Sequence, residues 1–124
     1  MDLFIALDVS LASTALCALN AHGKVVKEAK VDSEPEPLIA AMRALPGNVV
    51  AVGLEAGPLS QWLHRHMSEA GFPVVLLETR QVKGALKAMP IKTDRRDAEG
   101  IARLLQMGWF RPVHCKSVSA QEMR

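Results

Sequence analysis

The sequence contains no tyrosine, and its three phenylalanines and two tryptophans bring the aromatic share to only 4% of 124 residues. Hydrophobic residues nevertheless make up 49% of the chain, so a packed core is expected and must be mainly aliphatic. Proteins that bind single-stranded nucleic acid by base stacking need clustered aromatic rings. The composition therefore argues against that class of protein.

Cysteines and long apolar runs are also scarce. Cys17 and Cys115 are too far apart for a metal-ligand spacing, and two such residues are typical of reduced thiols in the cytoplasm. No apolar run approaches the roughly 18 residues that a membrane-spanning helix needs, and no basic region precedes the first apolar run, as it would in a signal peptide. We therefore predict a cytoplasmic protein without membrane contact.

The formal net charge of +2 conceals an uneven distribution. Residues 1–77 contain five Lys/Arg and eight Asp/Glu, a net charge of −3, whereas residues 78–124 contain ten and five, a net charge of +5. A basic segment beside an acidic remainder indicates an anionic partner, with nucleic acid as the first candidate. A solvated helix surface explains the same pattern equally well.

The hydrophobic pattern predicts five strands and four helices in one domain. Apolar runs, with a turn signal at His22-Gly23 before the third, predict strands at 3–8, 13–19, 24–31, 48–55 and 73–77. Capping residues, prolines and glycines mark the ends of helices at 33–45, 58–70, 80–88 and 94–107. Ser33 and Thr93 are the expected N-caps, and Trp62 of the second helix is expected in the core. The expected α/β fold is a mixed five-stranded sheet flanked by helices, which is the element order of the ribonuclease-H-like fold.

Two pairs of acids stand at the ends of these elements. Asp8 and Glu55 each end an apolar strand, and a parallel pairing of those strands would bring both to one sheet edge. Asp94 and Asp97 share a face at the start of the last helix. Turn formation and helix capping are alternative explanations for each pair. Four converging carboxylates would need divalent cations, and oxygen ligands favour two Mg²⁺ or Mn²⁺ ions suited to phosphoryl transfer.

Basic residues surround the second pair of acids. These cations, which could hold the phosphates that flank a scissile bond, are Lys92, Arg95, Arg96 and Arg103. Ordinary ion pairs on a helix surface are the alternative.

Several motifs resemble those of the DEDD-type insertion-sequence transposases, which are relatives of the Piv DNA invertase and the bridge-RNA-guided recombinases. The matching segments are 6–10 (Ala-Leu-Asp-Val-Ser), 53–58 (Gly-Leu-Glu-Ala-Gly-Pro), 72–75, 78–80, 92–98 (Lys-Thr-Asp-Arg-Arg-Asp-Ala) and 108–114. The segment 92–98 is the most specific of them. Leu11 stands where family members often carry lysine or a similar polar residue.

The resemblance implies a RuvC-like fold in a bacterial cytoplasmic protein and a catalytic, metal-binding tetrad of Asp8, Glu55, Asp94 and Asp97. It also implies binding of DNA and of a structured guide RNA, metal-dependent cleavage or strand transfer in DNA transposition, and assembly as a homo-oligomer. Residues 1–108 would form the catalytic domain. Residues 109–124 would begin the connection to a C-terminal transposase domain with a serine nucleophile, which nothing in this sequence matches. The chain by itself is therefore expected to be an incomplete enzyme that does not complete strand exchange.

Two other functions compete with this interpretation. A non-catalytic module that binds nucleic acid or supports assembly would keep the fold without using the acids. An actin-like or sugar-kinase-like ATPase lobe shares the strand order and an early aspartate, but it needs a glycine-rich phosphate loop after the first strand. Residues 9–13 contain no glycine, which argues against the ATPase.

Overall fold

The computed structural model describes residues 1–88 and 97–108. The predicted cap Thr93, the predicted helix start at Asp94 and the whole of 109–124 lie outside the described residues. The elements, in chain order, are β1 (Asp2–Val9), β2 (Ser13–Asn20), β3 (Val25–Asp32), α1 (Pro35–Arg43), β4 (Asn48–Glu55), α2 (Ser60–Glu69), β5 (Val74–Leu77), α3 (Thr79–Ala88) and α4 (Asp97–Met107).

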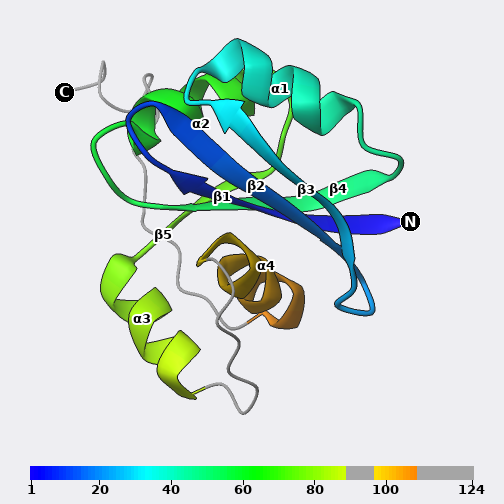
Figure 1. Ribbon diagram of the computed structural model, residues 1–124, viewed down its shortest axis with the longest axis vertical. Coiled ribbons are helices and arrows are strands. Elements are labelled where there is room, and N and C mark those ends of the chain that lie inside the picture. Colours follow the sequence, from blue (N-terminus) through cyan, green and yellow to red (C-terminus); the bar gives the residue numbers. More distant parts are fainter. Residues whose placement is uncertain (89–96, 109–124) are drawn as a thin grey trace, which may run out of the picture.

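The five strands form one mixed sheet in the order β3-β2-β1-β4-β5 (Figure 1). The first three strands form an antiparallel meander, in which β1 pairs with β2 and β2 with β3. The chain then passes through α1 to β4, which lies parallel to β1, and through α2 to β5, which lies parallel to β4. The predicted α/β fold class and element order are confirmed.

Alternation along the strands divides the core into two layers. Ile5 and Leu7 of β1 pack with Leu38 of α1 and Leu63 of α2 on one face of the sheet. Ala6 packs on the other face, with residues of α3 and α4. The largest fully buried side chains are all leucine, isoleucine or methionine, as the scarcity of aromatic residues predicts.

Helix α4 crosses the face of the sheet on which Ala6 lies, and its carboxyl end is near the β2–β3 turn. The Gln106 side chain donates a hydrogen bond to the Ala21 carbonyl oxygen in that turn, at 2.9 Å. Figure 1 shows the other end of α4 on the side of the molecule where β1 ends. Its first residue, Asp97, therefore begins the helix near the carboxyl end of β1.

Two predictions about single residues are wrong. Trp62 is 41% exposed rather than in the core, because Leu63 and Met67, one turn apart, occupy the inward face of α2. Ser33 does not cap α1, which starts at Pro35 with Glu34 at the N-cap position and no side-chain cap hydrogen bond. The Ser33 hydroxyl group is buried and bonds to the segment that follows β1 instead.

Candidate functional site

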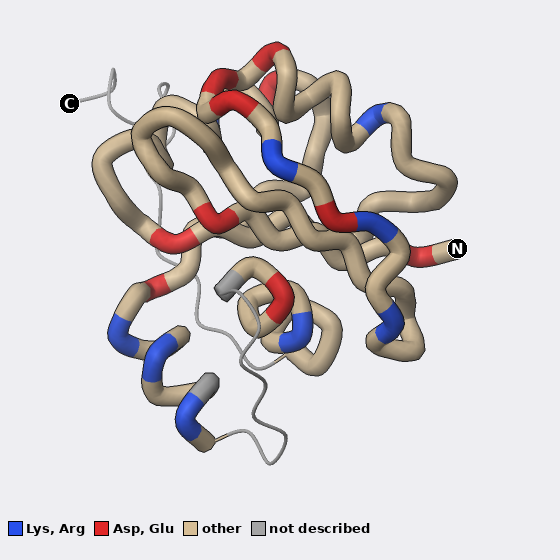
Figure 2. Tube along the Cα trace, viewed as in Figure 1, with Lys and Arg blue, Asp and Glu red and all other residues tan. Residues whose placement is uncertain are grey.

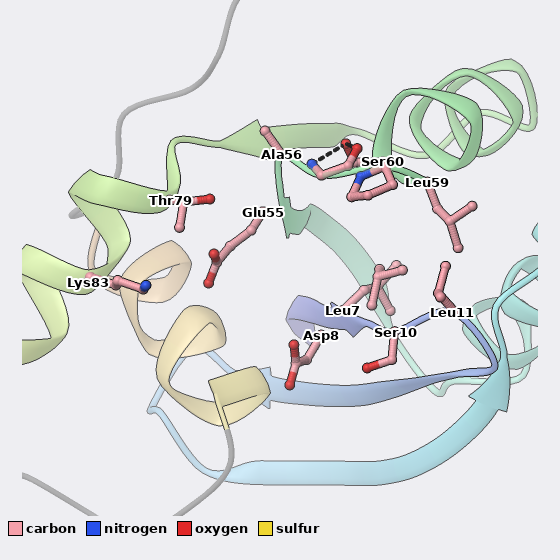
Figure 3. A pocket seen from close by; sticks show the side chains of 13 residues that line it. Leu7, Asp8, Ser10, Leu11, Glu55, Ala56, Leu59, Ser60, Thr79 and Lys83 are labelled. Carbon is pink, nitrogen blue, oxygen red and sulfur yellow. Dashed lines mark hydrogen bonds between the residues drawn. The ribbon is translucent and has the colours of Figure 1, made fainter.

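A cavity of about 380 Å³ lies at the edge of the sheet where β1 and β4 end (Figure 3). Three segments line it: residues 7–11 at and after the end of β1, residues 55–60 after β4, and Thr79 with Lys83 on α3. These segments are far apart in sequence, and the parallel pairing of β1 with β4 and of β4 with β5 brings them to one edge.

Strand register places both predicted strand-end acids in this cavity. Leu7 pairs with Leu54, and Asp8 and Glu55 are the next residues on their strands. Because side chains alternate along a strand, Asp8 lies on the same face of the sheet as Ala6, and Glu55 lies on the same face as Gly53. This is the face covered by α4, which packs against Gly53. Both acids are half-buried, and Figure 3 shows their carboxylates turned into the cavity.

Hydrogen bonds fix the wall of the cavity that follows Glu55. The Gly57 backbone N–H group donates to the Ser60 hydroxyl oxygen at 2.7 Å, and that hydroxyl group donates to the Gly57 carbonyl oxygen at 2.7 Å. The Ala56 backbone N–H group donates to the Leu77 carbonyl oxygen of β5 at 3.0 Å. Glu55 therefore has a constrained backbone on its carboxyl side.

Ser33 fixes the turn that follows β1 in a similar way. Its hydroxyl group donates to the Ser10 carbonyl oxygen at 2.5 Å and forms a 2.7 Å hydrogen bond with the buried Thr14 hydroxyl group. Its backbone N–H group donates to the Ala12 carbonyl oxygen at 3.2 Å. Between these two anchored carbonyl groups, Leu11 lies at the rim of the cavity with 82% of its surface exposed.

The second predicted pair of acids is described only in part. Asp94 lies outside the described residues, and of Asp97 only the backbone, as the first residue of α4, is described. Among the described residues, no group of three or more His, Cys, Asp or Glu side chains is arranged to hold a metal ion. Asp8 and Glu55 nevertheless supply carboxylate oxygens, which are the donors that Mg²⁺ and Mn²⁺ prefer.

Of the predicted phosphate-binding cations, only Arg103 lies in the described part of the chain. Lys92, Arg95 and Arg96 lie outside it. The Arg103 guanidinium group forms an ion pair at 3.2 Å with the carboxylate of Glu99, which is buried. Arg103 also approaches Gly23 in the β2–β3 turn and does not line the cavity. A phosphate contact by Arg103 stays a prediction.

Lys83 lines the cavity although the motifs do not single it out. Figure 3 shows its side chain on the same side of the cavity as Glu55. Thr79 and Lys83 are one helical turn apart, just after a strand that runs parallel to β4, so their spacing places them on one face of α3. The spacing alone does not place that face at the cavity, because only the position of β5 beside β4 brings α3 to this edge.

Comparison with known proteins gives a family and a fold. The sequence matches the transposase family of the DEDD, IS110 type over residues 5–124. Among solved structures, the chain is similar to RuvC from T. thermophilus, solved in complex with a Holliday junction substrate. That likeness has a TM-score of 0.58 and 19% sequence identity, and it covers 91% of this chain and 100% of the RuvC chain. The search of curated proteins found no match. None of the described helices is long and apolar enough to cross a membrane.

Proposed function

Because this chain belongs to the DEDD transposase family of the IS110 type, we propose that it processes DNA at the cavity lined by Asp8 and Glu55. The observation that carries the proposal is the shared placement of these two acids at one edge of a RuvC-like sheet. The proposed reaction is cleavage or strand transfer at a phosphodiester bond during DNA transposition.

We propose Asp8, Glu55, Asp94 and Asp97 as the ligands of divalent cations, Mg²⁺ or Mn²⁺. Two such ions, if bound there, would neutralise charge at a scissile phosphate and would activate a water molecule or a DNA hydroxyl group. The two described acids suit this role because they are half-buried and lie on constrained backbone. The amino end of α4 favours a carboxylate at Asp97, since helix amino ends are partly positive.

The remaining lining residues would position the substrate. The Lys83 ammonium group lies at the cavity and would contact a phosphate oxygen. The Ser10 hydroxyl group, on the turn anchored by Ser33, would donate a hydrogen bond to another. Both side chains would hold phosphate oxygens, and neither would transfer a proton.

Three aspects of the wider assembly belong to the same proposal. DNA is the proposed substrate, and the structurally similar RuvC was solved with a Holliday junction. A structured guide RNA and further copies of this chain are the proposed partners. Residues 109–124 are proposed to connect residues 1–108 to a second transposase domain.

Metal binding tests the proposed site directly. Titration calorimetry with Mn²⁺ is expected to show binding to the wild type, weakened at least about tenfold, or about 1.4 kcal/mol, by Asp8→Asn or Glu55→Gln. The control Glu36→Gln removes an exposed carboxylate on α1, outside the cavity, and is expected to change nothing. Absent binding, or equal binding by wild type and Asp8→Asn, would contradict the metal site.

A nucleic-acid measurement separates the enzyme from the non-catalytic module. Cleavage of a synthetic four-way DNA junction in Mn²⁺ is expected for the wild type and not for Asp8→Asn. Tight junction binding without cleavage, unchanged by replacement of all four acids, would favour the module.

A further inference from the structure

Helix α3 carries positive charge and no negative charge. Its sequence, Thr-Arg-Gln-Val-Lys-Gly-Ala-Leu-Lys-Ala, contains Arg80, Lys83 and Lys87 but neither aspartate nor glutamate. All three cations are exposed. Figure 2 shows them along α3, on a part of the molecule that projects from the sheet.

Helical spacing places the three cations on one side of α3. At about 100° per residue, Arg80, Lys83 and Lys87 fall within an arc of roughly 60°. Val82 and Ala85 lie away from this arc; Val82 is fully buried in the second core layer, and Ala85 packs against that layer. The helix is therefore anchored by its apolar side and presents a stripe of cations outward.

Gly84 leaves an open space beside this stripe. It lies one turn from Arg80, about 40° away around the helix axis, and a Cβ atom built there would meet no atom within 4 Å. A glycine inside a helix makes the helix less stable than an alanine would. Its missing side chain leaves room for a bulky ligand to approach the helix backbone beside Arg80 and Lys87.

The stripe is continuous with the candidate site. Lys83 lines the cavity that contains Asp8 and Glu55. Lys87 lies one turn farther along α3, and the rise from Arg80 to Lys87 is about 10 Å. A nucleic-acid strand carries one phosphate per roughly 3.4 Å along a duplex axis, so this length spans several phosphates.

We propose that Arg80, Lys83, Gly84 and Lys87, here called the basic face of α3, bind the sugar–phosphate backbone of a nucleic acid next to the bond held at the cavity. The proposal rests on the proposed function and adds the path of the strand. The ligand chemistry is a row of phosphodiesters, which both DNA and structured RNA provide. Arginine and lysine contacts of this kind position the strand and carry no sequence information.

Salt dependence measures these contacts. The affinities of the full chain for a labelled four-way DNA junction and for an RNA stem-loop are measured by fluorescence anisotropy between 50 and 200 mM salt. Log affinity falls as log salt rises, and each lost phosphate contact makes this negative slope shallower by about 0.9 for duplex DNA. The triple variant Arg80→Gln, Lys83→Gln, Lys87→Gln is expected to reduce the magnitude of the slope by about two to three and to weaken binding about 10- to 100-fold near physiological salt.

The matched control removes the same charge elsewhere. Lys24, Lys27 and Lys30 are exposed on and beside the edge strand β3, two strands away from β1. Their triple replacement by glutamine is expected to leave the slope within one of the wild-type value. Equal losses for both triple variants, or no loss for the α3 variant, would overturn the proposal. A loss confined to the DNA or to the RNA arm would support it and identify the source of the phosphates.

A second variant tests close approach without changing charge. Gly84→Gln adds a side chain in open space, so the fold is expected to become more stable while junction binding weakens at least about fivefold, or about 1 kcal/mol. Greater stability with unchanged affinity would overturn the role of Gly84.

Failure of the basic face of α3 can be distinguished from failure of the proposed function. If only the basic face fails, the wild type binds nucleic acid and Mn²⁺, and the triple α3 variant binds nucleic acid as tightly as the wild type. If the proposed metal site fails, Asp8→Asn binds Mn²⁺ as the wild type does. A wild type that binds no nucleic acid would overturn both.

Discussion

The hydroxyl group of Ser33 connects three segments of the chain beside Asp8. It bonds to the Ser10 carbonyl oxygen in the turn after β1 and to the Thr14 hydroxyl group at the start of β2, while Ser33 itself follows β3. Ser33 and Thr14 are both buried. Buried polar groups are costly to leave without partners, so this pair stabilises the turn through the bonds that it makes.

Replacement of Ser33 by alanine tests this connection. We expect Ser33→Ala to lower the free energy of unfolding by about 1–3 kcal/mol, because the Thr14 hydroxyl group and the Ser10 carbonyl group each lose a partner. Urea unfolding followed by circular dichroism gives the value. Ser68→Ala, at an exposed position of α2, is the control and is expected to change stability by less than about 0.5 kcal/mol. Equal effects of the two substitutions would contradict the role of Ser33.

At the scale of elements, the packing of α4 against β4 depends on Gly53. A Cβ atom on Gly53 would lie 2.7 Å from the Leu105 Cδ1 atom, so β4 and α4 meet where β4 has no side chain. Glu55 is two residues farther along β4. The separation between α4 and the acid edge is therefore set partly by this glycine.

A double-mutant cycle tests the contact between Gly53 and Leu105. Gly53→Ala is expected to destabilise the protein by about 1–3 kcal/mol, because the added methyl group overpacks the interface. Combined with Leu105→Ala, which removes the opposing atoms, the same substitution should cost less, with a coupling energy of at least about 0.5 kcal/mol. Strict additivity of the two free-energy changes would show that the contact is unimportant.

Helix α3 offers a stability prediction of opposite sign. Gly84→Ala is expected to raise the free energy of unfolding by about 0.5–1 kcal/mol, because the alanine restricts the unfolded chain and meets no neighbour in the folded state. Gly71→Ala is a matched control: its Cβ atom also meets nothing within 4 Å, but φ is +98°. That substitution is expected to destabilise by about 1 kcal/mol. Thermal unfolding of both variants gives the comparison, and a shift in the same direction would contradict it.

Much of the element pattern was predictable because local signals and tertiary structure agree. Apolar runs and turn signals predicted the five strands, and Gly71 and Gly108, both with positive φ, end helices as expected. The positions of Asp8 and Glu55 at strand ends predicted their shared edge, once the strands were assumed parallel. The family match and the RuvC-like fold agree with the motifs.

What the sequence did not predict depends on contacts between distant segments. Ser33 matches the pattern of an N-cap, but Thr14 and Ser10 use its hydroxyl group instead. The exposure of Trp62 follows from which face of α2 meets the sheet. Lys83 reaches the cavity only because β5 lies beside β4. No local pattern contains this information.

At the scale of the whole molecule, the edge strand β3 is protected by charge. Its exposed residues include Lys27, Lys30 and Asp32, and charged side chains on an edge discourage pairing with another sheet. The positive charge of α3, by contrast, has no acid within its own helix. Helix α3 therefore contributes three of the ten Lys/Arg that make residues 78–124 basic.

The central position of β1 has a consequence for the order in which the molecule opens. Asp8 lies one residue before the end of β1, the middle strand of the sheet, whereas α3 lies outside the sheet and contacts α4. Amide hydrogen exchange is expected to be slowest in β1, through global unfolding, and faster in α3, through local opening. Equal protection of the two would contradict this hierarchy. If the hierarchy holds, β1, which carries the proposed metal ligand Asp8, would stay folded while α3, which is proposed to bind the nucleic acid, unfolds and refolds locally.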